Sequence, residues 1–108
     1  MSLLLLAALI ACTPYQNFTR APGVEVYPAT DNVSPIRLLD VEPERGFVTI
    51  GYAECLAKKA DDALPHLIQQ ARWHGGQALL NLQNHKDDNG KTVFRADVIR
   101  FTEPPFNS

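Results

Sequence analysis

The chain has 108 residues and a nearly balanced charge, with 10 basic and 12 acidic residues and a formal net charge of -2. This length allows one small domain with a modest core and leaves no room for a second. No basic run exceeds Lys58-Lys59, so the sequence disfavours a nucleic-acid partner and a polybasic patch for anionic lipid headgroups.

Residues 3–11 form an uncharged apolar run that ends at Cys12. The run is shorter than the roughly 20 residues of a membrane-spanning helix, but it suits the roughly 7 to 15 residue core of a signal peptide. Leu9-Ile10-Ala11-Cys12 resembles the lipobox of bacterial lipoproteins, although no basic residue precedes the leucines. The resemblance implies that residues 1–11 are a signal peptide and that Cys12 becomes the acylated amino terminus, carrying chains such as palmitate.

The residue after the lipidated cysteine indicates in which membrane a bacterial lipoprotein is retained. Lipoproteins kept in the inner membrane commonly have Asp there, whereas this chain has Thr13. The resemblance therefore implies a cell-envelope protein anchored in the outer membrane and facing the periplasm. The alternative is a buried amino-terminal helix in which Cys12 is an ordinary small apolar residue.

Residues 12–29 contain three prolines and a glycine with little periodicity, which is typical of a flexible tether. Within this segment, residues 24–27 alternate well enough to predict a short strand. We expect the folded domain to occupy residues 30–108.

Residues 36–42 and 47–52 are both rich in β-branched, leucine or aromatic residues. Between them, Pro43 and Gly46 mark a turn. The pattern predicts a hairpin, while residues 53–60 are compatible with the end of a strand or the start of a helix.

Asp61 and Asp62 suit the positive end of a helix dipole. Because a proline in a helix interior costs about 3 kcal/mol, Pro65 favours a helix that begins close to it, over residues 62–74. Gly75-Gly76 then ends the helix in the manner of a left-handed cap. The predicted buried stripe consists of Leu64, Leu67, Ile68 and Ala71.

Residues 77–83 and 92–101 are predicted strands on either side of a polar loop over residues 84–91. In the second strand, Phe94, Ala96 and Val98 share the face that should meet the helix. The fold class is therefore α+β: after the flexible tether, the order strand, strand, helix, strand, strand gives a small, mostly antiparallel sheet packed on one main helix.

The stretch Ala71-Arg72-Trp73-His74-Gly75-Gly76-Gln77-Ala78-Leu79-Leu80-Asn81-Leu82, set within this element order, resembles small bacterial envelope domains of the YbjQ-like type. That structural group includes the stress-sensing lipoprotein of the Rcs phosphorelay. The resemblance implies a helix on a small sheet. The disulfide framework of the Rcs lipoprotein does not carry over, since only Cys55 follows Cys12.

The residues with ligand chemistry form no recognisable catalytic or metal motif. His66, His74 and His85 are weak candidate metal ligands, because a site needs three or four converging groups. Cys55 is expected to be a buried thiol, with pairing between chains or reactivity as the other possibilities. We expect no enzyme activity and no cofactor.

Four residues are candidates for protein contact. Trp73 and His74 end the predicted helix, and tryptophan is enriched in binding hot spots; Asp87 and Asp88 lie in the predicted loop. Trp73 can instead cover the edge of the core, and the two aspartates can simply belong to a solvated turn.

The sequence thus predicts a non-enzymatic, membrane-anchored envelope lipoprotein that acts through protein contacts, as a sensor or an assembly accessory. Its partners would be the membrane, through the lipid on Cys12, and an envelope protein. The alternatives are a periplasmic lipoprotein that binds a small solute or a metal, and an immunity-type lipoprotein with a dedicated toxin.

Overall fold

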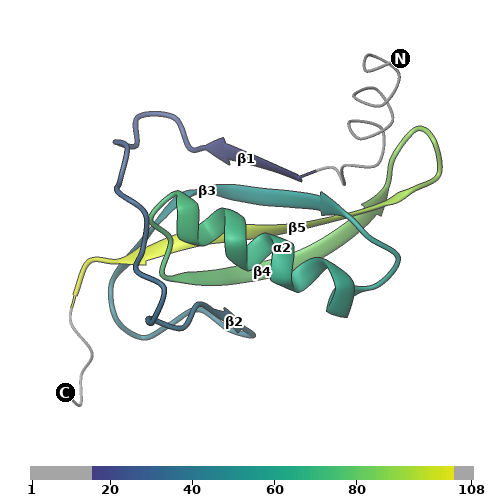
Figure 1. Cartoon of the computed structure of the whole chain (residues 1–108). Helices are drawn as coiled ribbons and strands as arrows, with labels where there is room; N and C mark the ends of the chain where they lie inside the picture. Colours follow the sequence, from purple (N-terminus) through teal and green to yellow (C-terminus); the bar gives the residue numbers. More distant parts are fainter. Residues whose placement is uncertain (1–15, 104–108) are drawn as a thin grey trace, which may run out of the picture.

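The computed structural model describes residues 16–103, which form one mixed sheet packed against one helix (Figure 1). The sheet order is β1-β3-β5-β4-β2, and every neighbouring pair is antiparallel except the parallel pair of β2 and β4. The prediction of an α+β fold with a mostly antiparallel sheet on one helix is confirmed. The elements are β1 (Gln16–Arg20), β2 (Arg37–Leu39), β3 (Phe47–Leu56), α2 (Ala60–Trp73), β4 (Ala78–Lys86) and β5 (Thr92–Phe101).

The predicted tether is wrong for part of its length, because Gln16–Arg20 forms β1, an edge strand paired with β3. Gly51 of β3 makes this pairing close, since a Cβ there would lie 2.2 Å from the carbonyl oxygen of Thr19. Residues 24–27 form no strand, but Val24 and Tyr27 pack against the core. The folded domain therefore begins well before residue 30.

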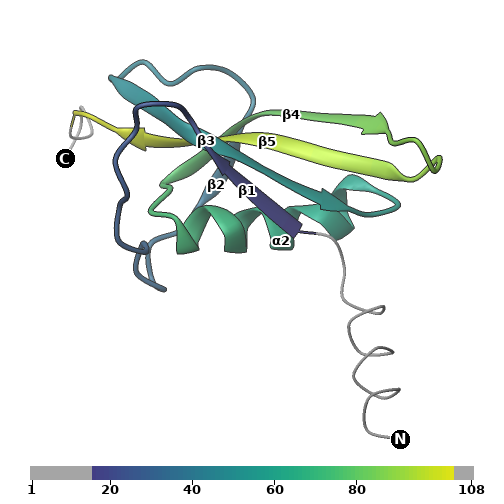
Figure 2. The same ribbon diagram turned by 90° about the horizontal axis from the view of Figure 1, so that it is seen from above.

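The predicted hairpin between residues 36–42 and 47–52 is also wrong. β2 pairs with β4, whereas both edges of β3 are occupied by β1 and β5. Residues 40–46 carry the chain from one edge of the sheet past β4 and β5 to β3 (Figure 2). A proline and a glycine marked a change of direction correctly, but they did not specify which strands it joins.

The helix begins at Ala60, two residues before the predicted start, so Pro65 lies inside it. The amide that proline lacks would have bonded the carbonyl of Asp61, and both residues are exposed, so water can reach this side of the helix. The predicted glycine cap is confirmed: Gly75 has φ of +85°, and the Gly76 amide donates to the Ala71 carbonyl at 2.7 Å.

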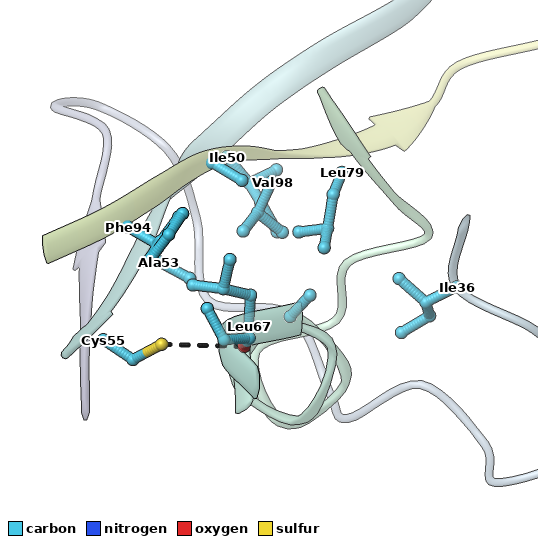
Figure 3. Packing of buried hydrophobic residues seen from close by; sticks show 11 residues of the cluster. Ile36, Ile50, Ala53, Cys55, Leu67, Leu79, Phe94 and Val98 are labelled. Atoms are coloured by element: carbon cyan, nitrogen blue, oxygen red, sulfur yellow. Dashed lines mark hydrogen bonds between the residues drawn. The ribbon is translucent and has the colours of Figure 1, made fainter. Parts of the chain in front are cut away.

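The main core lies between α2 and the sheet (Figure 3). Phe94, Ala96 and Val98 of β5 face the helix as predicted, and Leu67 and Ala71 are fully buried against the sheet. Of the remaining predicted stripe, Leu64 and Ile68 are partly buried. The other buried members are Ile36, Ile50, Ala53, Cys55, Ala63 and Leu79.

A second, smaller cluster consists of the buried side chains of Ala78, Leu80 and Ile99. Leu39, Phe47 and Phe101 pack against it. The pairing of β4 with β5 shifts between Leu80 and Gln83, where Asn81 has φ of 60°. This irregularity changes the strand's alternation, so that Leu80 joins the second cluster while Leu82 packs against the main core.

The strand register defines two ends of the sheet. At the entry end, β1 begins opposite Cys55, and Leu56 is paired with Val93. At the far end, Phe47 is paired with Phe101, and β2 and β4 begin side by side.

A candidate binding groove at the far end

The predicted lipidation site, Cys12, lies outside the described residues. Among residues 16–103, no helix is both long and apolar enough to cross a membrane. Cys55, the other cysteine, is completely buried, and its Sγ–H donates to the Ala63 carbonyl at 3.5 Å (Figure 3). Burial raises the pKa of the Cys55 thiol, and the prediction of a buried cysteine is confirmed.

The two aromatic candidates at the end of α2 have different surroundings. Trp73 is 54% exposed, which leaves it available for contact. The His74 imidazole instead stacks on the Phe18 ring of β1, with ring centroids 4.0 Å apart and planes 7° apart. Burial, with a smaller effect of Arg20, lowers the pKa of His74 below its usual 6.5. We infer that His74 fastens the edge strand to the helix.

Two of the three histidines lie on or next to the helix, and the third lies on a strand. His66 and His74 belong to α2 and its carboxyl end, while His85 lies on β4 and not in the predicted loop. Within the described part of the chain, no three or more His, Cys, Asp or Glu side chains are placed to hold a metal ion. The metal alternative therefore gains no geometric support.

The two loop aspartates also differ. The Asp87 carboxylate accepts the amides of Asn89 and Lys91, both at 2.9 Å, and thereby fixes the turn between β4 and β5. Asp88 is exposed. Asp88 thus stays a candidate contact residue, while Asp87 also has this structural role.

A groove of about 580 Å³ lies at the far end, and no sequence pattern indicated it. Its walls come from the segment before β2, from β2 itself, from the β2–β3 connection, and from the adjoining ends of β4 and β5. Leu39, Ala78 and Phe101 contribute apolar surface to its lining. The charged side chains in the lining are Asp31, Arg37, Arg45 and Arg100.

Two of the arginines stack on aromatic rings. The Arg45 guanidinium lies 3.5 Å from the centre of the Phe101 ring, and that of Arg100 lies 4.3 Å from the centre of the Tyr27 ring. Arg100 also donates to the Gly75 carbonyl at 2.6 Å. A guanidinium stacked in this way keeps N–H groups along its edge for a carboxylate or phosphate. Arg37 is exposed on β2.

Asp31 does not neutralise this cationic lining by pairing with an arginine of the groove. Its carboxylate accepts the amides of Val33 at 3.0 Å and Ser34 at 2.7 Å, and also the Ser34 hydroxyl. The bond from the Ser34 amide is the main cause that lowers the pKa of Asp31. Asp31 therefore remains ionised and shapes its own turn.

The wall around Asp31 is fastened to the end of the helix. Arg72 donates to the carbonyls of Asp31 and Ser34, the latter at 3.0 Å. The Thr30 amide donates to the Arg72 carbonyl at 2.8 Å, and the Thr30 hydroxyl donates to the Gly76 carbonyl at 2.6 Å. This side of the groove is consequently preorganised.

The groove borders an unpaired strand edge. β2 is the last strand of the sheet, with β4 on one side and no strand of the described chain on the other. Such an edge exposes backbone N–H and C=O groups to an added extended peptide. Arginine side chains, apolar surface and a free strand edge together can bind an extended segment that carries carboxylates.

No signal in the sequence could have located this groove. Arg37, Arg45 and Arg100 stand in different parts of the chain and follow no spacing rule. They meet because β2 joins β4 in parallel, and this long-range pairing was not predicted. The contacts of Arg72 and Thr30 depend on the same arrangement.

The chain matches no protein-family model, no curated protein and no solved structure. The resemblances to bacterial lipoproteins and to YbjQ-like domains therefore stay predictions.

Proposed function

We propose that this protein is a non-enzymatic lipoprotein of the cell envelope, acylated on Cys12 and held at the outer membrane facing the periplasm. Its folded domain acts by contact with another envelope protein. The lipobox-like motif Leu9-Ile10-Ala11-Cys12 supports the anchor. The arginine-lined groove supports the contact role and is the observation that carries it.

The partner that fits the groove is an extended, acidic segment of a protein. Carboxylates would bind the edges of Arg37 and Arg45, since charge-assisted, bidentate pairs are the strong ones. The segment's backbone would extend the sheet along β2. The exposed Trp73, at the end of the helix that holds the groove wall, is a further contact residue.

The positions of the predicted anchor and of the groove support a role in contact with a periplasmic protein. β1 begins at the entry end, and only residues 13–15 separate it from Cys12. The groove lies at the opposite end of the sheet. Anchorage at Cys12 therefore leaves the groove at the end of the sheet that is farther from the attachment point, where a periplasmic partner can reach it.

A small anionic solute is the second candidate, and the size of the groove favours it. Its volume of about 580 Å³ falls within the range of roughly 300 to 1,000 Å³ found for small-molecule sites. A peptide and a solute make different demands, because only the peptide uses the free edge of β2. The partner experiment separates them.

The test compares three forms of the full, tagged chain in the cell envelope: wild type, R37Q/R45Q and K58Q/K91Q. The last variant removes the same charge at the other end of the sheet. We expect co-purification of a specific envelope protein with wild type and K58Q/K91Q. R37Q/R45Q should recover at least about ten-fold less, since a hydrogen bond to a charged group contributes about 1.5 to 3 kcal/mol.

Equal recovery with R37Q/R45Q, or no specific protein with any form, would contradict the contact role. The anchor is tested separately by the intact mass of the mature protein. Wild type should lack residues 1–11 and carry acyl chains, whereas a Cys12→Ser variant should be unprocessed or released. A wild-type protein that keeps Met1 and stays unacylated would contradict the anchor.

A further inference from the structure

All four lysines of the chain gather at the entry end of the sheet. Lys58 and Lys59 lie between β3 and α2, while Lys86 and Lys91 flank the turn between β4 and β5. All four are exposed. No basic run in the sequence exceeds Lys58-Lys59, which disfavoured a polybasic patch. The fold nevertheless brings the connection between β3 and α2 and the turn between β4 and β5 to the same end of the sheet (Figure 1).

Three of these lysines line one hollow of about 450 Å³. Lys58, Lys86 and Lys91 surround it together with Leu56, Ala57, Gly90 and Thr92, and the Lys86 ammonium donates to the Thr92 hydroxyl at 3.1 Å. No carboxylate lines the hollow. The acidic residues at the same end include Asp61 and Asp62 in the first turn of α2, Asp87 and Asp88 in the hairpin turn, and Glu54 of β3.

The path of the chain brings this hollow close to the predicted anchor. Gln16, the first residue of β1, is paired with Cys55, one residue before Leu56 in the hollow's lining. Four residue steps from Cys12 to Gln16 span at most about 14 Å. The flexible tether predicted through residue 29 would have allowed several times that distance, whereas β1 removes most of this freedom.

We propose that the lysine-lined hollow at the entry end binds the anionic headgroups of the membrane. The proposal rests on the acylation of Cys12 proposed above. Lysine suits this surface because its ammonium is a compact charge on a flexible stem and needs no fixed partner geometry. Each lysine near an anionic surface strengthens membrane binding about five-fold. Lys58 and Lys91 together should therefore contribute about twenty-five-fold.

This contact adds an orientation to the anchor. A lipid on Cys12 alone fixes the distance of the domain from the bilayer but lets it rotate. Headgroups held at the lysine-lined hollow would stop that rotation, with the arginine-lined groove directed away from the membrane.

The experiment uses the mature, acylated protein in lipid nanodiscs. A fluorophore is placed through Asn89→Cys, in the exposed turn beside the hollow, and a control fluorophore through Val41→Cys in the exposed β2–β3 connection. Cys55 is buried and should stay unlabelled. The nanodiscs contain a headgroup-attached quencher in phosphatidylcholine, either alone or mixed with phosphatidylglycerol.

We expect phosphatidylglycerol to increase quenching at position 89 and not at position 41. High salt should abolish the increase, because the Debye length falls to about 3 Å at 1 M. The increase should also be lost in K58Q/K91Q and retained in R37Q/R45Q, which removes the same charge at the far end.

Quenching that does not depend on phosphatidylglycerol, or that K58Q/K91Q leaves unchanged, overturns the proposal. The intact mass of the same sample shows which inference has failed. An acylated protein without the lipid-dependent change overturns the headgroup contact alone. A protein without acyl chains overturns the anchor and the headgroup contact together.

Discussion

Both ends of the sheet carry basic side chains, but these side chains are of different kinds. The entry end has all four lysines, whereas three of the six arginines line the groove at the far end. The groove arginines Arg45 and Arg100 are packed on aromatic rings, while the lysines are exposed. A planar, held guanidinium selects the geometry of its partner, whereas a mobile ammonium responds mainly to charge. The difference favours a specific protein contact at one end and a lipid surface at the other.

The ends also differ in how their backbone is held. The far end depends on close packing of the helix end against residues 27–34, through Gly75, Thr30 and Arg72. The turn at the entry end depends mainly on Asp87 and its own neighbours. Perturbations can therefore act on both ends together or on one alone.

A substitution in the shared core should destabilise both ends of the sheet together. Leu67 is completely buried in the core between α2 and the sheet (Figure 3), so Leu67→Ala should lower the free energy of unfolding by about 3 kcal/mol. Urea unfolding should shift equally whether followed by Trp73 at the far end or by a fluorophore at position 89. Val48→Ala, at a 39% exposed side chain, is the control and should change little. Separate transitions at the two probes would show that the ends do not share one core.

Two glycines distinguish the two ends, because both have positive φ and only one is closely packed. A Cβ at Gly75 would lie 2.6 Å from Cβ of Tyr27, whereas one at Gly90 would meet nothing within 4 Å. Gly90→Ala should cost about 1 kcal/mol, from backbone strain alone. Gly75→Ala should cost at least about 1 kcal/mol more and increase amide exchange in residues 27–34.

Equal losses in the two glycine variants would contradict the close packing of the groove wall. Chemical denaturation gives the free energies, and hydrogen exchange followed by mass spectrometry locates the change. Exchange in the turn between β4 and β5 should stay unaltered in Gly75→Ala, since that turn belongs to the entry end.

The next prediction concerns His74, which stacks on Phe18 of the edge strand β1. Because the pKa of His74 is lowered in the folded protein, the unfolded chain binds the proton more readily. The resulting stability is fully present above the ordinary pKa of 6.5 and is lost as the pH falls through the lower folded value. His74→Phe keeps an aromatic ring against Phe18 and should remove this dependence.

Denaturation of both proteins across this pH range checks the His74 prediction. Arg20→Gln is a useful comparison, since removal of the nearby cation should weaken the pH dependence without abolishing it. If His74→Phe retained the full loss of stability below pH 6.5, another group would be responsible.

Local sequence patterns predicted the elements but not their long-range partners. The helix, its glycine end and the inward face of β5 follow from periodicity and backbone preference, which act within a few residues. β1 was missed because its apolar content is low, with Phe18 as its one core contact. Its place depends on a gap beside β3 that Gly51 keeps open.

The groove and the lysine-lined hollow lay beyond the sequence for the same physical reason. Each is assembled from segments that strand pairing brings together. Arg37 and Arg100 line the groove, and Lys58 and Lys91 line the hollow. Among the residues with ligand chemistry, only the buried state of Cys55 could be predicted, because free cysteine is among the most buried residue types. Sequence spacing identifies functional residues that share one helix or strand, but it does not identify residues that come together from separate strands.

The smallest effect concerns Asp31, whose carboxylate accepts backbone amides in the turn that forms part of the groove wall. Asp31→Asn keeps a side-chain oxygen that can accept the amides of Val33 and Ser34, while Asp31→Ala removes it. Because the pKa of Asp31 is lowered in the folded protein, its contribution is present above pH 3.8 and is lost as the pH falls further. Stability measured from neutral to acidic pH should therefore fall less steeply in both variants, and at neutral pH Asp31→Ala should be the less stable. Identical stability of the two variants at neutral pH would mean that the charge alone, and not the accepted amides, holds the turn that borders the arginines.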